Sequence, residues 1–301
     1  MKHFVSVLDM DEKILERLLS DAARLKVIRK EGKAHEYLHG KNLAMIFEKS
    51  STRTHMSFEV GINELGGHAL FMNAKDMQIG RGEEISDTAK VASRYVQGVM
   101  IRANRHSTIE EFARYATIPV INGLSDREHP CQILADILTI QERFGKTRDL
   151  RVAWIGDGNN VCNSLILSAS ITGMEITVAS PAAFAPPADI VSLAQNQGGK
   201  ISVIRDPLQA AKDADVLVTD TWISMGDEAE KEERLRVFHG YTIDANLLKM
   251  ANPEAIVMHC LPAHRGEEIS AEVIDGPQSA VWDEAENRLH AQKALLVYLM
   301  Q

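Results

Sequence analysis

Short apolar runs of four or five residues alternate along the chain with longer stretches of helical periodicity. The first run, 43–47, has the length of a buried strand, and the mixed region after it suits a helix that ends at Gly66-Gly67. Because helical segments separate the apolar runs, the pattern predicts parallel sheets with helices on both faces. The other predicted strands are 68–72, 98–102, 119–122, 152–155, 176–179, 201–204, 216–219 and 256–259.

The alternation stops once and then restarts, which indicates two domains. A predicted helix from 132 to 144 is followed by the charged run 146–151, and a new strand begins directly after it. A length of 301 residues also suits two domains. We therefore expect an α/β fold of two doubly wound parallel-sheet domains with an active-site cleft between them. The expected domains are 1–132 and 133–283, with the C-terminal helix 284–301 packed back on the first.

Composition narrows the class of protein without identifying its function. The chain is 45% hydrophobic and 25% charged, as in ordinary globular proteins, and its net charge of −9 argues against nucleic acid or an anionic membrane as partner. Its three scattered cysteines cannot form a disulfide framework and fit a reducing compartment. With no apolar run of membrane-spanning length and no signal or transit peptide, we expect a cytoplasmic protein.

Hydroxyl-bearing residues and one arginine mark the turn after the first strand. Ser50, Ser51 and Thr52 stand where a helix begins, and side chains of this kind cap exposed amide groups. Those amides, the helix dipole and Arg53 can together bind an anion, and arginine can hold a phosphate with two parallel hydrogen bonds. From these residues alone, an ordinary helix cap with a surface arginine is an equally good interpretation.

Other polar residues follow predicted strands of the same sheet. Ligands bind at the carboxyl ends of parallel strands, where Ser51, Arg102 and the stretch after Asn122 all lie. Within that stretch, His129 precedes a proline at a helix start, where a neutral imidazole can donate a hydrogen bond to a carbonyl oxygen. Gln132, one turn later, can bind an amide. Taken by itself, this histidine is better explained as a helix-start residue without a ligand.

A further motif follows the predicted strand 216–219 in the second half. Asp220 can pair with an ammonium group, while Ser224 and nearby backbone amides can hold a carboxylate. The alternative is a solvated loop, because Asp, Ser and Gly are common in turns. His259 and Cys260 follow the strand 256–259, and a thiol beside a histidine suggests a nucleophile.

Two cofactor hypotheses are weaker. Zinc held by His259 and the three cysteines is disfavoured because no paired C-x-x-C spacing supports it, so a buried structural cysteine is the better interpretation. Gly156-Asp157-Gly158 after a strand suggests a dinucleotide fold, yet Val161 replaces the third glycine of the fingerprint. No acidic residue ends the next strand, so nicotinamide binding is disfavoured and Asn160 is better interpreted as a polar ligand contact.

Four motifs together resemble a known family. They are SSTRT at 50–54, HPCQ at 129–132, DTWISMG at 220–226 and HCLP at 259–262. In this order they resemble the aspartate/ornithine carbamoyltransferase family along nearly the whole chain, and the SMG and HCLP elements indicate a member that uses ornithine. Each motif alone is a weak signal, whereas four in register are a strong one.

The resemblance implies that the chain transfers the carbamoyl group of carbamoyl phosphate to the δ-amine of L-ornithine, giving L-citrulline and phosphate. It implies no metal and no cofactor, a carbamoyl phosphate-binding first domain, an ornithine-binding second domain, and a homotrimer or an assembly of trimers. The implied catalytic residues are Arg53, Arg102, His129, Asp220 and Cys260. The implied carbamoyl phosphate-binding residues are Ser51, Thr52, Arg53, Thr54, Gln78, Arg102, His129, Gln132, Cys260, Leu261 and Arg288. The implied ornithine-binding residues are Asn160, Asp220, Ser224 and Met225.

Two points stay open at this stage. Many relatives carry a second arginine where this chain has His55, which leaves open how strongly cations reinforce the phosphate site or a subunit interface. The acceptor could also be aspartate or putrescine, although putrescine has no carboxylate for the SMG region to bind. A non-catalytic relative that binds carbamoyl phosphate is a further alternative, against which the retained Arg53, His129, Asp220 and Cys260 argue.

Overall fold

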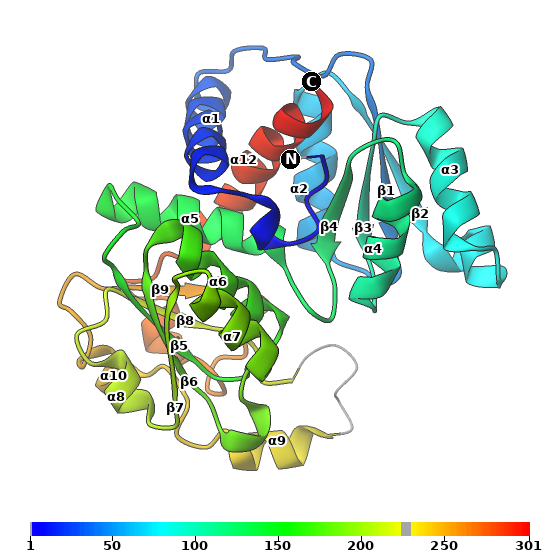
Figure 1. Cartoon of the computed structure of the whole chain (residues 1–301). Coiled ribbons are helices and arrows are strands. Elements are labelled where there is room, and N and C mark those ends of the chain that lie inside the picture. Colours follow the sequence, from blue (N-terminus) through cyan, green and yellow to red (C-terminus); the bar gives the residue numbers. More distant parts are fainter. Residues whose placement is uncertain (1, 224–229) are drawn as a thin grey trace. The chain divides into compact units, whose positions relative to one another are not determined.

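The computed structural model describes residues 2–223 and 230–301. By its internal contacts the chain divides into two compact units: Met1–Leu138 with Glu286–Gln301, and Thr139–Ala285. Each unit contains one parallel sheet with helices on both faces (Figure 1). The predicted α/β class with two doubly wound parallel-sheet domains is therefore confirmed.

The first unit contains a four-stranded parallel sheet in the order β2-β1-β3-β4. Its strands are β1 (Asn42–Phe47), β2 (His68–Asn73), β3 (Gly98–Arg102) and β4 (Val120–Leu124). Its helices are α1 (Glu12–Lys30), α2 (Thr52–Glu64), α3 (Ile85–Tyr95), α4 (His106–Tyr115), the first part of α5 (Pro130–Phe144) and the second part of α12 (Val281–Met300). The short 3₁₀ helices are η1 (Val7–Asp9), η2 (Ala74–Asp76) and η3 (Gln78–Arg81).

Alternating residues of β1 and β3 fill the two faces of this sheet. Ala44 and Ile46 pack with residues of α3 and α4, among them Ile109 and Phe112. The opposite face carries α2 and α12. These helices approach closely at Gly61, where an added Cβ would lie 3.2 Å from the side chain of Lys293. Both faces are thus covered at the central strands β1 and β3, which explains why these strands are largely apolar rather than alternating in polarity.

The second unit contains a five-stranded parallel sheet in the order β7-β6-β5-β8-β9. Its strands are β5 (Arg151–Ile155), β6 (Glu175–Ala179), β7 (Lys200–Ile204), β8 (Val216–Thr219) and β9 (Ile256–His259). Its helices are α6 (Asn160–Thr172), η4 (Ala182–Phe184), α7 (Ala188–Asn196), α8 (Pro207–Ala211), α9 (Lys231–Val237), α10 (Ala245–Leu248) and α11 (Ala271–Ile274).

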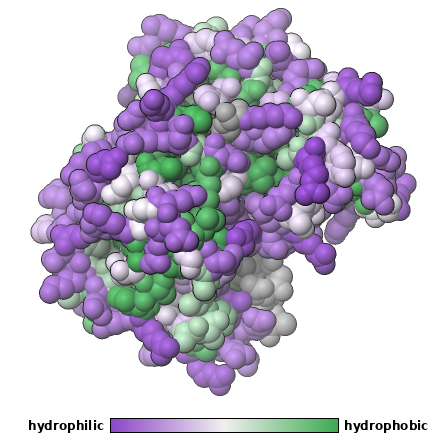
Figure 2. All heavy atoms as spheres, in the orientation of Figure 1, coloured by the Kyte–Doolittle hydropathy of each residue, from purple (hydrophilic) through white to green (hydrophobic). Residues whose placement is uncertain are grey.

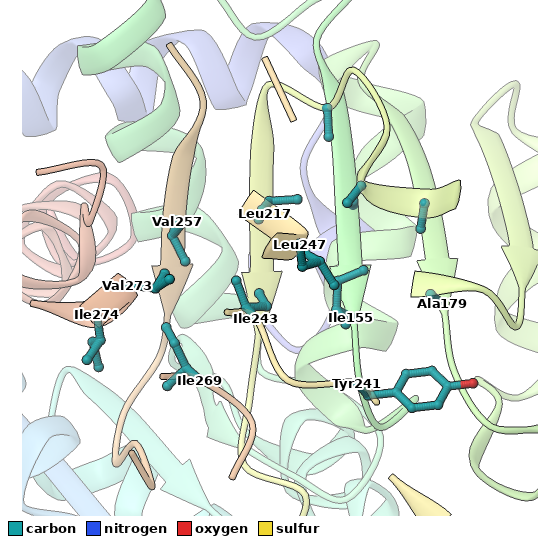
Figure 3. Close-up of a cluster of buried hydrophobic side chains, with 14 of the residues drawn as sticks. Ile155, Ala179, Leu217, Tyr241, Ile243, Leu247, Val257, Ile269, Val273 and Ile274 are labelled. Atoms are coloured by element: carbon teal, nitrogen blue, oxygen red, sulfur yellow. The ribbon is translucent and has the colours of Figure 1, made fainter. Parts of the chain in front are cut away.

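One buried cluster forms the core on one face of the second sheet. Ile155, Leu217 and Val257 from adjacent strands meet Ile243, Leu247, Ile269, Val273 and Ile274 from the segments that follow β8 and β9 (Figure 3). At roughly 1.5–3 kcal/mol for each large side chain that is removed from water, such a cluster stabilises the sheet and fixes where its strands end.

Hydrophilic residues cover most of the face that Figure 2 shows, with apolar residues interspersed. One exception concerns the edge strand β2, where Leu70 and Phe71 are 46% and 50% exposed. Met56 and Val60 on the neighbouring helix α2 are exposed as well. Among the described helices, none combines the length and the apolar composition that crossing a membrane requires.

Candidate active site

The strand order of the first sheet creates a topological switch point. The chain moves outward from β1 to β2 and then returns to β3 on the other side of β1, so the carboxyl ends of β1 and β3 form a topological switch point. Ser51 caps α2 at this point, and its Oγ accepts a hydrogen bond from the Thr54 N–H at 3.3 Å. Arg53 lies in the first turn of α2, and Arg102 is the last residue of β3 and is buried.

Arg288 of α12 links α5 and α2 near this switch point. Its side chain is buried and donates one hydrogen bond to Gln132 Oε1 at 2.7 Å and another to Thr54 Oγ1 at 3.3 Å. Gln132 in turn donates through Nε2 to Asp136 Oδ1 at 2.8 Å. These bonds hold the guanidinium and the amide in fixed orientations.

His129 lies among these cationic groups and is buried. Burial lowers its pKa well below the ordinary value, and the positive charges of Arg288, Arg102 and Arg53 lower it further. The imidazole is therefore neutral at pH 7. A neutral imidazole has one N–H to donate to a carbonyl oxygen, and the three guanidinium groups favour an anion beside it.

The second sheet has its own switch point between β5 and β8. Asp220 follows β8 and is 7% exposed, and its carboxylate is held from both sides. The amide of Asn159 donates to Oδ2 at 2.7 Å, while the Thr221 N–H and the Cys260 thiol donate to Oδ1 at 2.8 Å and 3.1 Å. This cluster, in contrast to the first, offers a negative charge and a thiol.

The turn after β9 is fixed by the histidine that precedes Cys260. His259 is buried, its Nε2 lies 2.9 Å from Glu268 Oε1, and its Nδ1 accepts the Leu261 N–H at 2.9 Å. Since Nδ1 is an acceptor, Nε2 carries the proton that Glu268 accepts. Leu261 has a φ of 60°, an uncommon conformation for a residue with a side chain, and this hydrogen bond supports it.

The zinc alternative finds no support in the positions of the cysteines. Of the possible metal-ligand groups within 2–223 and 230–301, one combines Asp220, His259 and Cys260, and neither of the two contains another cysteine. In that group the Cys260 thiol already donates to Asp220, and His259 donates to Glu268. The remaining two cysteines are buried, and burial raises the pKa of the Cys131 thiol to about 12.

The glycine pair after β5 has a structural role. A Cβ at Gly158 would lie 2.3 Å from the backbone nitrogen of Pro186, so only glycine lets this loop approach. Asn159 caps α6 by accepting hydrogen bonds from the N–H groups of Val161 and Cys162. Two amides that a dinucleotide phosphate would bind are thus already used, which agrees with the missing third glycine.

Family models and relatives identify the class of protein. A model described as the carbamoyl-P binding domain of aspartate/ornithine carbamoyltransferase matches residues 2–142, and the model of the Asp/Orn binding domain matches 148–299. The ornithine carbamoyltransferase of Methanoculleus marisnigri is 64% identical over 99% of this chain and 97% of that protein. The chain belongs to the aspartate/ornithine carbamoyltransferase family. This confirms the resemblance found in the four motifs.

Further relatives agree with this assignment. The ornithine carbamoyltransferase of Archaeoglobus fulgidus is 55% identical, over 100% of this chain and 98% of that protein. The solved structure of the ornithine carbamoyltransferase of Pyrococcus furiosus superimposes with a TM-score of 0.96 at 48% identity, covering 99% of this chain and 97% of that one.

Within the first compact unit, most of the residues predicted to bind carbamoyl phosphate gather at one switch point. Thr54, Gln132 and Arg288 are joined by hydrogen bonds, and Arg53, Arg102 and His129 are close enough for their charges to interact. Ser51 caps the helix that carries Thr52. Gln78 lies elsewhere in the sequence, exposed at the first residue of η3.

Within the Asp/Orn binding domain, Asp220 and Cys260 are in direct contact, and Leu261 follows in the same turn. Asn160 is the first residue of α6, adjacent to the asparagine that contacts Asp220. Ser224 and Met225 lie outside the described residues.

Two contacts near these sites were not predicted from the sequence. Asn159 donates a hydrogen bond to Asp220, and its position before a helix in the sequence is a capping signal that could have drawn attention to it. His55 stacks on Phe71 of the edge strand with ring centroids 4.3 Å apart and pairs with Glu59 at 2.8 Å. No local sequence signal predicts that stacking.

Proposed function

We propose that this chain transfers the carbamoyl group of carbamoyl phosphate to the δ-amine of L-ornithine, giving L-citrulline and phosphate. The observation that carries the proposal is the opposite chemistry of the two switch points in a chain of this family. The first gathers three guanidinium groups around a neutral imidazole, which suits a doubly charged acyl phosphate with a carbonyl oxygen. The second holds a carboxylate and a thiol, which suits an amine.

The reaction joins the δ-nitrogen of ornithine to the carbonyl carbon while the bond from that carbon to the phosphate oxygen breaks. Negative charge builds on the carbonyl oxygen, where Arg53, Thr54, Arg102 and His129 are the proposed donors. Donors of this kind contribute about 3 kcal/mol each, or roughly a hundredfold in rate. The departing phosphate takes the proton that the attacking amine loses.

The amine must be neutral before it attacks. Asp220 and Cys260 are the proposed groups for positioning it and favouring the loss of its proton. The contact between the Cys260 thiol and the carboxylate supports a shared role for the pair rather than a covalent acyl-enzyme. Gln132 and Arg288 would bind the carbamoyl amide and the phosphate, Cys260 and Leu261 would line the reaction centre, and Asn160, Ser224 and Met225 would bind the ornithine backbone groups.

We also propose a homotrimer that acts in arginine metabolism in the cytoplasm. An exposed edge strand with Leu70 and Phe71 on it is a surface that proteins usually cover, which supports self-association at β2. His55, which stacks on Phe71, belongs to this surface. In such a trimer Gln78 would reach the site of a neighbouring subunit. Analytical ultracentrifugation tests the trimer, and a Phe71→Lys variant should yield monomers.

Citrulline formation with each candidate acceptor tests the activity. The purified chain is given carbamoyl phosphate with ornithine, aspartate or putrescine, and the carbamoylated product and phosphate are measured. We expect turnover with ornithine at least about a hundredfold above the other two, since a site built to pair a substrate's polar groups strongly rejects analogues that lack them. Equal turnover with aspartate or putrescine would refute ornithine specificity, and no turnover with any acceptor would favour a non-catalytic role.

A further inference from the structure

A buried carboxylate, that of Glu128, stands next to His129 in the loop between β4 and α5. It is 2% exposed, and none of the roles proposed above uses it. Burying a carboxylate is costly unless hydrogen bonds compensate for the lost water. Its contacts therefore indicate what it does.

The partners of this carboxylate come from the N-terminal segment. Glu128 Oε2 accepts the Val7 N–H at 2.9 Å, and the Ser6 hydroxyl also donates to the carboxylate. Ser6 is itself fixed, because its Oγ accepts the Leu8 N–H at 3.2 Å and it caps η1. The carboxylate thus joins two parts of the chain that lie 121 positions apart.

The same N-terminal segment runs beside the edge strand β4 (Figure 1). The Phe4 N–H donates to Val120 O at 2.8 Å, and the Asn122 N–H donates to Phe4 O at 2.8 Å. The side-chain amide of Asn122 adds a bond to Val5 O at 2.9 Å. The segment is therefore fastened both to the strand and to the loop that follows it.

The backbone of Glu128 is held inside the loop as well. Its carbonyl accepts the Ser125 N–H at 2.9 Å, and its own N–H donates to Ser125 Oγ at 3.2 Å. With the side chain anchored on η1 and the backbone closed on Ser125, little freedom remains for His129, which comes next, or for the helix that Pro130 begins.

We propose that Glu128 is a positioning residue, which anchors the loop carrying His129 to the Ser6 hydroxyl and the Val7 N–H and so aims the imidazole at carbamoyl phosphate. The inference rests on the proposed function. Burial raises the pKa of Glu128 to about 6, and the hydrogen bonds from Ser6 and Val7 oppose that rise, so the group is an ionised acceptor above that pH. An ionised acceptor forms stronger hydrogen bonds than a neutral one.

A proline at position 7 removes the hydrogen bond from the backbone N–H to Glu128, and it also replaces a buried valine side chain. Val7 is the first residue of η1, where proline is well tolerated, and Ser6 has the extended backbone (φ −127°, ψ 156°) that a residue before proline prefers. Val7→Pro therefore deletes the N–H that binds Glu128. Glu128→Ala removes the acceptor instead, and Glu128→Gln keeps an oxygen that can accept it.

Steady-state kinetics of these variants test the proposal. We expect Val7→Pro and Glu128→Ala to lower kcat/KM for carbamoyl phosphate about tenfold or more, the scale of a misplaced catalytic group. The KM for ornithine should stay within about twofold in both, because the acceptor half-site is not involved. Glu128→Gln should keep kcat/KM for carbamoyl phosphate within about threefold of the unmodified chain. Adding Glu128→Gln to Val7→Pro should cause no further loss, since both changes act on the same hydrogen bond.

Leu25→Ala, a truncation in the core at the end of α1, serves as the matched control for lost stability. Should it produce the same loss at an equal drop in thermal midpoint, Glu128 has only a structural role and the proposal is wrong. Unchanged carbamoyl phosphate kinetics in Val7→Pro would overturn it too, even if Glu128→Ala does not fold. An unmodified chain that forms no citrulline refutes the proposed function, whereas normal turnover with insensitive variants refutes only the role of Glu128.

Discussion

The two switch points share one architecture and carry opposite chemistry. In each, a central strand has neighbours wound outward on both sides, and polar side chains collect at the carboxyl ends. The first collects arginines around a histidine that they keep neutral, whereas the second collects an amide, a thiol and a backbone N–H around one carboxylate. The fold thus supplies the position, and the residues after each strand decide which charge is bound.

Removing Arg53, the cation in the first turn of α2, should cause the largest loss of activity among the changes predicted here. We expect Arg53→Ala to lower kcat/KM by at least about a thousandfold, because the guanidinium is proposed to bind the dianion and to meet charge in the transition state. Phosphate binding should be lost while folding is preserved, as measured by calorimetric titration and circular dichroism. Arg114→Ala, an exposed arginine on α4, is the control, and an Arg53 variant with equal activity would remove this residue from the mechanism.

Removing the negative charge of Asp220 in the second unit should impair the use of ornithine and leave carbamoyl phosphate binding unchanged. Asp220→Asn preserves size and removes the negative charge, so we expect kcat/KM for ornithine to fall about a hundredfold. Carbamoyl phosphate affinity should change by less than about twofold. Asp213→Asn, at an exposed carboxylate paired with Arg151, is the matched control. Equal losses for both substrates would show that the two half-sites are not chemically separate.

The sequence predicted the sheets well and the convergence of side chains less well. Strands buried on both faces, such as β1, β3 and β8, form continuous apolar runs, so they could be found without knowing their neighbours. Short helices such as α8, α10 and α11 span four or five residues, too few for a helical period to appear, and were missed.

Within the candidate site, local sequence patterns predicted some of the functional residues but not the contacts between distant ones. The turn at Ser51 and Arg53 indicated an anion site because capping chemistry is visible over a few residues. The contact of Arg288 with Thr54 spans 234 positions and depends on how α12 packs, so only the family resemblance suggested it. The hydrogen bond from Asn159 to Asp220 was not predicted, because the two residues lie 61 positions apart and meet only where β5 and β8 end side by side.

Replacing His129, which is neutral at pH 7, should cause an intermediate loss of activity. We expect His129→Gln to lower kcat about tenfold to a hundredfold, because an amide N–H can replace the imidazole donor only in part. The folded pKa is lowered, so the unfolded chain binds a proton that the folded chain does not, and His129 makes the protein less stable as pH falls below about 6.5. Proton NMR of the imidazole should show no titration between about pH 6 and 8. A titration inside that window would mean that the arginines do not surround a neutral ring.

The two units also differ in the hydrogen bonds that fix their central residue. In the second unit they reach the Asp220 side chain itself, and in the first they anchor Glu128, the residue before His129. This difference predicts a smaller, pH-dependent effect on stability. Between its ordinary pKa of 4.5 and the folded value of about 6, Glu128 is protonated more in the folded chain than in the unfolded one.

Rising pH across that window should therefore lower the free energy of unfolding, by about 2 kcal/mol for a shift of this size. Glu128→Gln cannot ionise, so its unfolding free energy should lack this decrease, as measured by urea unfolding from pH 4.5 to 7. Asp9 raises the pKa of Glu128 and Arg127 lowers it, so Asp9→Asn should lower that pKa and reduce the decrease in part. If the unfolding free energies of the unmodified chain and the Gln variant showed the same pH dependence, ionisation of Glu128 would not be the cause of the decrease. The two half-sites would then be anchored alike.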